Sequence, residues 1–272
     1  MRTYNDIDVL KKCIDQKRPF GEEMLQQVKD YYRIGLTWSS NAIEGNTLTE
    51  SETKILLEDG LTVGGKPLKD TFETLGHAKA YDFMFTLLHK GKITEDDICT
   101  MHRMFYQNIE AEYAGKYRTT PVFITGSRYP VCETEKIPYE MEKLFQWADK
   151  KRNSFHPVEF AALFHKKLVF IHPFKDGNGR ISRLAMNTAL IQKGYLPAII
   201  PPVLRPTYIQ SLEKAHKDDT TFLEFISERV FESEKDFMRL LNLPLPSQIK
   251  PEKAEIPDYL KDIDNRSHRP RR

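Results

Sequence analysis

The residues best suited to chemistry in this chain lie in one short segment, residues 172–183. Gly177 and Gly179 have no Cβ atom, so the backbone can take left-handed angles there and come close to a ligand. When a loop of this kind leads directly into a helix, its free backbone N–H groups form an anion-binding site. The spacing therefore predicts that Gly177, Asn178 and Gly179 bind phosphate.

The charged residues of the same segment fit a polyphosphate accompanied by a metal ion. Arg180 and Arg183 are three residues apart, so both lie on one face of the expected helix and both can contact phosphate oxygens. Asp176 provides a hard oxygen ligand of the kind that Mg²⁺ prefers. His172 can be neutral near pH 7 and can then take a proton from a hydroxyl. These residues predict group transfer from a nucleotide to a hydroxyl, and their spacing does not choose which phosphorus is attacked.

A second His-Pro pair in the chain serves as an internal comparison. His156 and Pro157 are followed by Val158 and Glu159 rather than by a glycine loop. That pattern is typical of a helix with proline at its first position. We therefore interpret only His172 as a functional histidine.

Residues 172–183 resemble, at every fixed position, the His-Pro-Phe-x-Asp/Glu-Gly-Asn-Gly-Arg-x-x-Arg signature of Fic-domain proteins. The resemblance implies a mainly helical, compact fold and an autoinhibited protein adenylyltransferase. Such an enzyme transfers AMP from ATP to a serine, threonine or tyrosine hydroxyl of a protein, itself included. ATP and Mg²⁺ are the implied cofactors. Asp176 would hold the metal ion, Arg180 the β-phosphate and Arg183 the γ-phosphate.

The segment from Ser40 to Gly45 resembles the Ser/Thr-x-x-x-Glu-Gly/Asn inhibitory motif by which Fic proteins restrain themselves. Glu44 falls in the last turn of an expected helix, where a negative charge opposes the helix dipole at a cost of about 0.3–1 kcal/mol. The resemblance implies that Glu44 binds Arg183 through both carboxylate oxygens and so excludes the γ-phosphate. Ser40, one turn earlier, would hold the helix in place.

Two short β-prone runs flank Gly126 and Ser127 within residues 117–132, which predicts a β-hairpin. The resemblance implies that this hairpin is a flap over the active site. Such a flap would position an extended segment of the target protein by main-chain hydrogen bonds. The residues expected to do so are Val122, Phe123, Ile124 and Thr125.

Apolar residues at helical spacing predict that most of the chain is helical. Thr94 and Asp97 form the pattern of a capping pair at one helix start. We expect helices at 22–43, 71–88, 94–105, 157–171, 178–193, 207–217 and 221–241. We divide the chain into N-terminal helices (1–92) that include the inhibitory helix (about 22–45), a core (93–200), C-terminal helices (201–243) and a disordered tail (244–272).

Composition excludes several classes of protein. The chain has 272 residues and a net charge of +2, which gives no reason to expect a nucleic-acid or membrane partner. It has no apolar run of about eighteen residues. Cys13, Cys99 and Cys132 lack metal-ligand spacing, so we expect a reducing, cytoplasmic compartment.

Two expectations on partners and ligands rest on the resemblance alone. Tyr208 follows the signature at a place where related proteins line the adenine pocket, so its ring is expected to stack on the base. Related proteins also often form homodimers, and we expect a homodimer here.

Three other functions remain open at this point. Glu44 could orient a water molecule that removes AMP, which would make the protein a deAMPylase. A different nucleotide or phosphate group could be transferred. The non-enzymatic alternative is a nucleotide-sensing interaction module, against which an intact His172 argues, because a sensor needs no base.

Overall fold

The computed structural model describes residues 3–62 and 64–249, and the expected disordered tail lies outside the described residues from 250 onward. The described residues form ten α-helices: α1 (Tyr4–Asp15), α2 (Glu22–Ile43), α3 (Glu50–Glu58), α4 (Leu68–Thr86), α5 (Glu95–Tyr106), α6 (Ile137–Lys151), α7 (Pro157–Ile171), α8 (Asn178–Ile191), α9 (Arg205–Lys214) and α10 (Thr220–Leu240). They also form three short 3-10 helices, Leu88–Lys90, Thr134–Lys136 and Pro202–Leu204.

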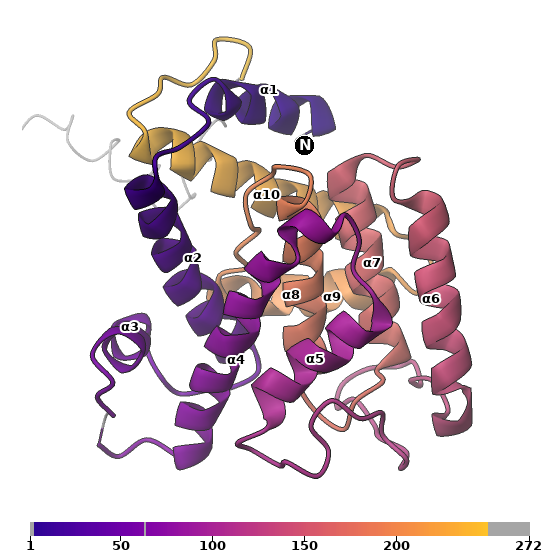
Figure 1. Ribbon diagram of the computed structural model, residues 1–272. Coiled ribbons are helices and arrows are strands. Elements are labelled where there is room, and N and C mark those ends of the chain that lie inside the picture. Colours follow the sequence, from indigo (N-terminus) through magenta and orange to yellow (C-terminus); the bar gives the residue numbers. More distant parts are fainter. Residues whose placement is uncertain (1–2, 63, 250–272) are drawn as a thin grey trace, which may run out of the picture.

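The helix that follows the glycine loop, α8, lies at the centre of the molecule (Figure 1). From Asn178 to Leu190 its side chains are buried on every face, which is the pattern of a helix enclosed by others. Helices α2, α4, α5 and α7 all contact it. The glycine loop is therefore fixed to a central, enclosed helix of the fold.

Helix α7 brings residues 172–177 to this centre. Its buried aromatic and aliphatic residues, including Phe160, Phe164 and Leu168, pack between α6 and α8. It ends at His172, which has a left-handed backbone (φ 54°) and so turns the chain sharply into the loop. The loop then leads directly into α8 at Asn178.

The helices expected at 22–43 and 157–171 are confirmed with the same bounds, and the other five expected helices are present with ends shifted by one to three residues. Thr94 and Asp97 form the predicted capping box of α5. The left-handed Gly45 (φ 95°) follows α2, as its position after the expected helix indicated. Helices α1, α3 and α6 were not predicted.

The predicted strands of a β-hairpin at 117–132 are wrong, since no residue in the described ranges forms a β-strand. Pro121 and Pro130 have no N–H to give to a strand partner. The side chain of Arg118 instead bonds the carbonyl of Thr120 on one arm and that of Cys132 on the other. A guanidinium group therefore closes this segment as a loop, where a hairpin would have used backbone hydrogen bonds.

None of the helices in residues 3–62 and 64–249 combines the length and the apolar character needed to span a bilayer.

Candidate active site

His172 is held at the end of α7 by hydrogen bonds to the main chain on both sides. The Nε atom of Arg118 donates to the His172 carbonyl (2.8 Å), and the Arg118 N–H donates to the Pro173 carbonyl (2.9 Å). Burial lowers the pKa of His172 to about 4. The imidazole is therefore neutral at pH 7, which is the form that can accept a proton.

The loop after His172 is fixed by the side chain of Asn178. Its Oδ1 accepts from the Phe174 N–H and its Nδ2 donates to the Phe174 carbonyl, each at 2.8 Å. At Gly177 (φ 81°) a Cβ atom would lie 2.7 Å from Phe105, so glycine is required by space as well as by conformation. The side-chain amide of Asn178 is thus committed to the loop. The backbone N–H groups at the start of α8, which were the groups predicted to contact phosphate, are left for an anion.

His102 on α5 also supports the loop, and it belongs to no sequence motif that would single it out. Its ring stacks on the ring of Phe174, with 3.9 Å between the ring centroids, and its Nε2 lies 3.1 Å from the Asp176 carbonyl oxygen. Because the Gly115 N–H donates to Nδ1 (2.9 Å), the proton is on Nε2 and is donated to Asp176. His102 therefore fixes the position of the Asp176 backbone.

Arg180 is buried and paired with two carboxylates. Its guanidinium lies 2.8 Å from Glu73 on α4 and 3.1 Å from Asp176. It also lies over the ring of Phe105, 4.5 Å from the centroid. The Nδ2 of Asn46 donates to the same Glu73 carboxylate (3.0 Å). Sequence reasoning missed Glu73, because a lone acid on a helix shows no sign of facing an arginine from another element.

Arg183 is held by the end of α2. Its Nε donates to the Ser40 hydroxyl (2.9 Å), and one terminal nitrogen donates to the Ser40 carbonyl (2.9 Å) and to Oε1 of Glu44 (2.7 Å). The predicted two-oxygen contact of Glu44 is therefore a contact through one oxygen. Ser40 and the Tyr208 hydroxyl take the other donors. Burial favours neutral Glu44, but the charges of Arg183 and Arg180 outweigh it and hold its pKa below the ordinary value.

The Glu44 carboxylate also covers the start of α8. A Cβ atom placed on Gly179 would lie 2.4 Å from Glu44 Oε1 and 3.1 Å from a terminal nitrogen of Arg183. The carboxylate thus occupies the position where the loop was predicted to bind phosphate. Only glycine at position 179 leaves room for an anion there.

Tyr208 on α9 lies beside Arg183, fully enclosed with 1% of its surface exposed. Its hydroxyl is 2.9 Å from Nε2 of His165 and 3.4 Å from Arg183. The ring lines the same cavity as His172 and Glu44. These contacts make it a support for Arg183, and its stacking on adenine stays a prediction.

The cavity shared by these side chains is small. It measures about 140 Å³ and is bounded by Glu44, His172, Gly179, Arg183 and Tyr208, together with parts of α9 and of the 124–131 segment. Pockets that enclose small-molecule ligands usually measure about 300–1,000 Å³. With the Glu44 side chain in this position, the cavity is therefore smaller than a typical ligand pocket.

The segment expected to be a flap is anchored to α9. The Ser127 hydroxyl donates to Glu213 (2.6 Å), and the Arg128 N–H donates to the same carboxylate (3.2 Å). Nearby, Phe123 is 94% exposed and Ile124 borders the catalytic cavity. Val122 lies beside them and Thr125 is exposed at the turn. Of the four residues predicted to position a target, Ile124 thus borders the cavity and the other three do not.

Asp176 is the residue that fits the expected Mg²⁺. Its Oδ1 accepts from the Gly177 N–H (2.6 Å) and from Arg180, while Oδ2 is 3.9 Å from Lys69 and the side chain is 42% exposed. No cluster of three or more His, Cys, Asp or Glu residues suited to a metal occurs in residues 3–62 and 64–249. One carboxylate at a phosphate site suits Mg²⁺, which usually takes its other ligands from phosphates and water.

Four buried histidines predict a stability that falls in mild acid. Burial lowers the pKa of His77 and His165 to about 3, and that of His102 and His172 to about 4, from an ordinary value of 6.5. Below pH 6.5 these four histidines bind protons in the unfolded chain but remain neutral in the folded protein. Each histidine then costs up to about 1.4 kcal/mol per pH unit. Glu234 acts in the opposite direction, because burial raises its pKa to about 7.

The destabilising effect of the four histidines is larger than the opposing effect of Glu234. The free energy of unfolding should therefore decrease steadily from pH 6.5 to pH 5 in urea titrations. The carboxylates with lowered pKa values lose their contribution only at lower pH, so this window reports the histidines. The Glu234→Gln variant removes the opposing group and should steepen the decrease. A free energy of unfolding that is constant across this window would contradict the neutral, buried state of the four histidines.

Comparison with known proteins agrees with this geometry. Residues 92–190 match the model of the Fic/DOC family. "Protein adenylyltransferase Fic" from Nematostella vectensis is 39% identical over 233 residues, which are 82% of this chain and 54% of that protein. The protein of the same name from Drosophila grimshawi is 38% identical over 261 residues, 91% of this chain and 53% of that protein. The chain spans about half the length of these curated relatives.

Two solved structures have a similar fold. Fic-1 from C. elegans superposes with a TM-score of 0.80 at 29% identity, over 88% of this chain and 72% of that chain. A Fic-domain-containing signaling protein from Bacteroides thetaiotaomicron superposes with a TM-score of 0.80 at 27% identity, over 89% of this chain and all of that chain (100%). The helical arrangement described above is therefore the Fic fold.

Proposed function

Because this chain belongs to the Fic/DOC family, we propose that it is a protein adenylyltransferase restrained by its own helix α2. One observation carries the proposal: neutral His172, the start of α8 and Arg183 face a single cavity. These are a base, an anion site and a cation, which are the groups that nucleotide transfer to a hydroxyl requires. The name and similarity of the adenylyltransferase relatives favour the α-phosphorus as the point of attack.

In the proposed reaction His172 accepts the proton of a protein hydroxyl. The hydroxyl oxygen forms a bond to the α-phosphorus of ATP, and the bond from that phosphorus to the oxygen bridging the β-phosphate breaks. Pyrophosphate leaves with the bonding electrons, and AMP remains on the protein. The backbone at Gly177–Gly179 would hold the α- and β-phosphates, and Arg180 would share its charge between the β-phosphate and its two carboxylate partners.

Asp176 would hold Mg²⁺, which supplies charge neutralisation for the phosphates when bound. The chain's own contribution to that site is to keep the carboxylate in place. The Gly177 N–H and Arg180 both donate to Oδ1, and Oδ2, whose nearest charged neighbour is Lys69 at 3.9 Å, would be the oxygen offered to a ligand. The exposed fraction of the side chain, 42%, leaves it open to a nucleotide that enters with its metal ion.

The proposed restraint acts by occupation of the γ-phosphate site. In this state the Glu44 carboxylate accepts a hydrogen bond from Arg183 and lies over Gly179. The donors of Arg183 are held by Ser40, Glu44 and Tyr208 in this state, which would keep them from a phosphate oxygen. ATP that binds beside the carboxylate would therefore keep its α-phosphorus out of line with the attacking hydroxyl.

The test compares two positions of the label on ATP. The purified Glu44→Gly variant is incubated with Mg²⁺ and ATP labelled on the α-phosphate or on the γ-phosphate. The proposal expects the α-label on protein and the γ-label in pyrophosphate. Protein labelled from γ would identify a phosphoryl transferase. Label on no protein, with or without a cell extract as a source of targets, would reject AMP transfer.

A further inference from the structure

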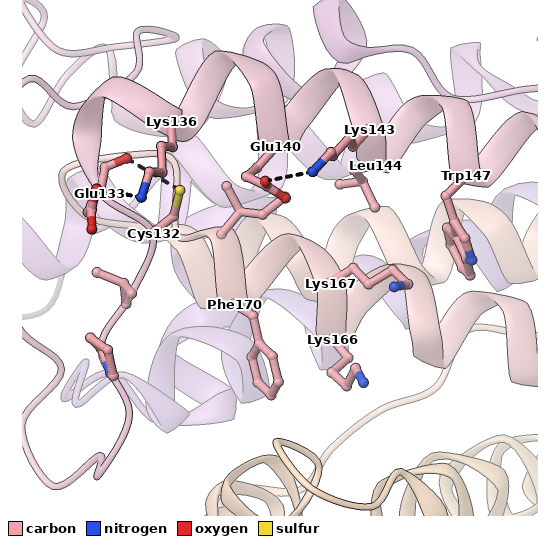
Figure 2. A pocket seen from close by; sticks show the side chains of 13 residues that line it. Cys132, Glu133, Lys136, Glu140, Lys143, Leu144, Trp147, Lys166, Lys167 and Phe170 are labelled. Carbon is pink, nitrogen blue, oxygen red and sulfur yellow. Dashed lines mark hydrogen bonds and ion pairs between the residues drawn. The ribbon is translucent and has the colours of Figure 1, made fainter.

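A groove of about 650 Å³ lies between α6 and α7 and is closed at one end by residues 130–133 (Figure 2). Neither the nucleotide site nor the restraint uses it. Its position beside the catalytic loop raises the question of what it binds.

The groove continues from the catalytic cavity. Pro130, Val131 and Phe170 line both spaces, and Ile171 in the groove is the residue before His172. An extended polypeptide whose hydroxyl reaches His172 can therefore pass over Val131 and Phe170 into the groove. The groove would then receive the residues that flank the modified one.

The walls of the groove combine apolar surface with an excess of positive charge. Leu144 and Trp147 project from α6 and Phe170 from α7 (Figure 2). Four lysines and two glutamates also line it, an excess of two positive charges: Lys136, Lys143, Lys166, Lys167, Glu133 and Glu140.

The glutamates that pair with two of these lysines would compete only weakly with the carboxylates of a ligand. Lys136 pairs with Glu133 (2.8 Å) and Lys143 with Glu140 (3.2 Å), and all four side chains are exposed by 38% or more. Exposed pairs of this kind contribute about 0–1 kcal/mol, so an incoming carboxylate can replace them.

The two lysines on α7 differ from those on α6. Lys166 is held by Asp219 (2.5 Å). Lys167 has no ion pair within the described ranges, and its ammonium group lies 4.9 Å from the centre of the Trp147 ring. Burial lowers the pKa of Lys167. A carboxylate that neutralises this ammonium group would relieve the cost of its burial.

We propose that the α6–α7 groove binds an acidic segment of the target protein next to the hydroxyl that is modified. This inference rests on the proposed function, because it makes the occupant part of the substrate. The segment would place an apolar or aromatic side chain against Leu144, Trp147 and Phe170, and its carboxylates against the lysines. Selection of acidic over neutral flanking sequence follows from this charge distribution.

The test measures binding without ATP. A short fluorescein-labelled peptide contains one serine, one phenylalanine and otherwise aspartate and glutamate, and a second peptide carries the corresponding amides. Fluorescence anisotropy should show the acidic peptide binding at low salt, more tightly than the amide peptide and more weakly as salt rises. The Lys136→Glu/Lys143→Glu variant should weaken binding of the acidic peptide by at least about tenfold.

A variant with the same change in charge serves as the matched control. Lys12→Glu/Lys17→Glu alters two exposed lysines, one in α1 and one just after it. Helix α1 lies away from α6 (Figure 1), so this variant should leave the affinity unchanged within about twofold. The inference is overturned if there is no saturable binding, if the amide peptide binds equally well, or if both variants lose the same affinity. It is also overturned if ATP binding, rather than peptide binding, is lost in the groove variant, because the occupant would then be a nucleotide.

The two proposals can fail separately. Peptide binding in the groove can be observed in a protein that transfers no AMP. Conversely, a failure of the peptide assay leaves the outcome of the labelled-ATP experiment unchanged.

Discussion

AMP transfer by the Glu44→Gly variant is expected to be at least about tenfold faster than by the unchanged protein, a difference of about 1.4 kcal/mol in the barrier. The reason lies in the Arg183 guanidinium, whose donors are held by Ser40 and by the Glu44 carboxylate. Removal of that carboxylate frees one N–H of a terminal nitrogen for the γ-phosphate, while the same nitrogen keeps its bond to the Ser40 carbonyl. It also clears the space above Gly179. The measurement is the initial rate at which α-labelled AMP appears on protein.

Asp59→Gly is the matched control for this variant. Asp59 caps the end of α3 as Glu44 caps the end of α2, and it is exposed and remote from the cavity. The control should label protein at the unchanged rate. Glu44→Gln should fall between the two, because it removes the charge but keeps the volume. Equal rates for Glu44→Gly and the unchanged protein, both folded by circular dichroism, would refute the restraint.

Loss of His172 is expected to reduce AMP transfer by a factor of about 10²–10⁴, the usual contribution of a general base. The effect should be measured in the Glu44→Gly background, where the starting rate is high enough to follow a large decrease. His172 has a left-handed backbone (φ 54°), which asparagine tolerates better than alanine. We therefore expect His172→Asn to keep the loop in place while it removes the base.

Two comparisons separate loss of the base from loss of the loop. ATP affinity, measured by equilibrium binding, should be similar for His172→Asn and for the parent variant, because the anion site is formed by the backbone at the start of α8. His89→Ala, a change at an exposed histidine, should retain the full rate. Retention of more than about a tenth of the rate by His172→Asn would mean that another group takes the proton.

The helical fold was predictable where apolar residues recur at helical spacing. Helix α2 (Glu22–Ile43) and helix α7 (Pro157–Ile171) have clear start and stop signals and were located with their correct ends. Helix α3 (Glu50–Glu58) was not, although Thr49 and Glu52 form a capping box. It is short, and only two of its side chains are buried, so its apolar pattern is weak.

The hairpin prediction failed for a reason that local sequence could not reveal. Residues 117–132 have strand-forming side chains on both sides of Gly126. In the folded protein the two arms are tied by Arg118, which also bonds the His172 carbonyl. The side chain of Arg118 takes backbone carbonyls of this segment that a hairpin would pair with backbone N–H groups. Where Arg118 lies depends in turn on the position of α7, because it also bonds the His172 carbonyl.

The sequence alone predicted the segment that we propose to be catalytic, because glycine spacing, the preceding histidine and two arginines are local features. It also indicated Glu44, at the end of α2, as the acid that would bind Arg183. Only the tertiary structure decided which partners complete the site: Glu73 on Arg180, His102 beneath the loop, Ser40 on Arg183 and the lysine-lined groove beside it. These contacts join residues far apart in the chain. Their existence depends on helix packing, and no local pattern encodes which buried faces will meet.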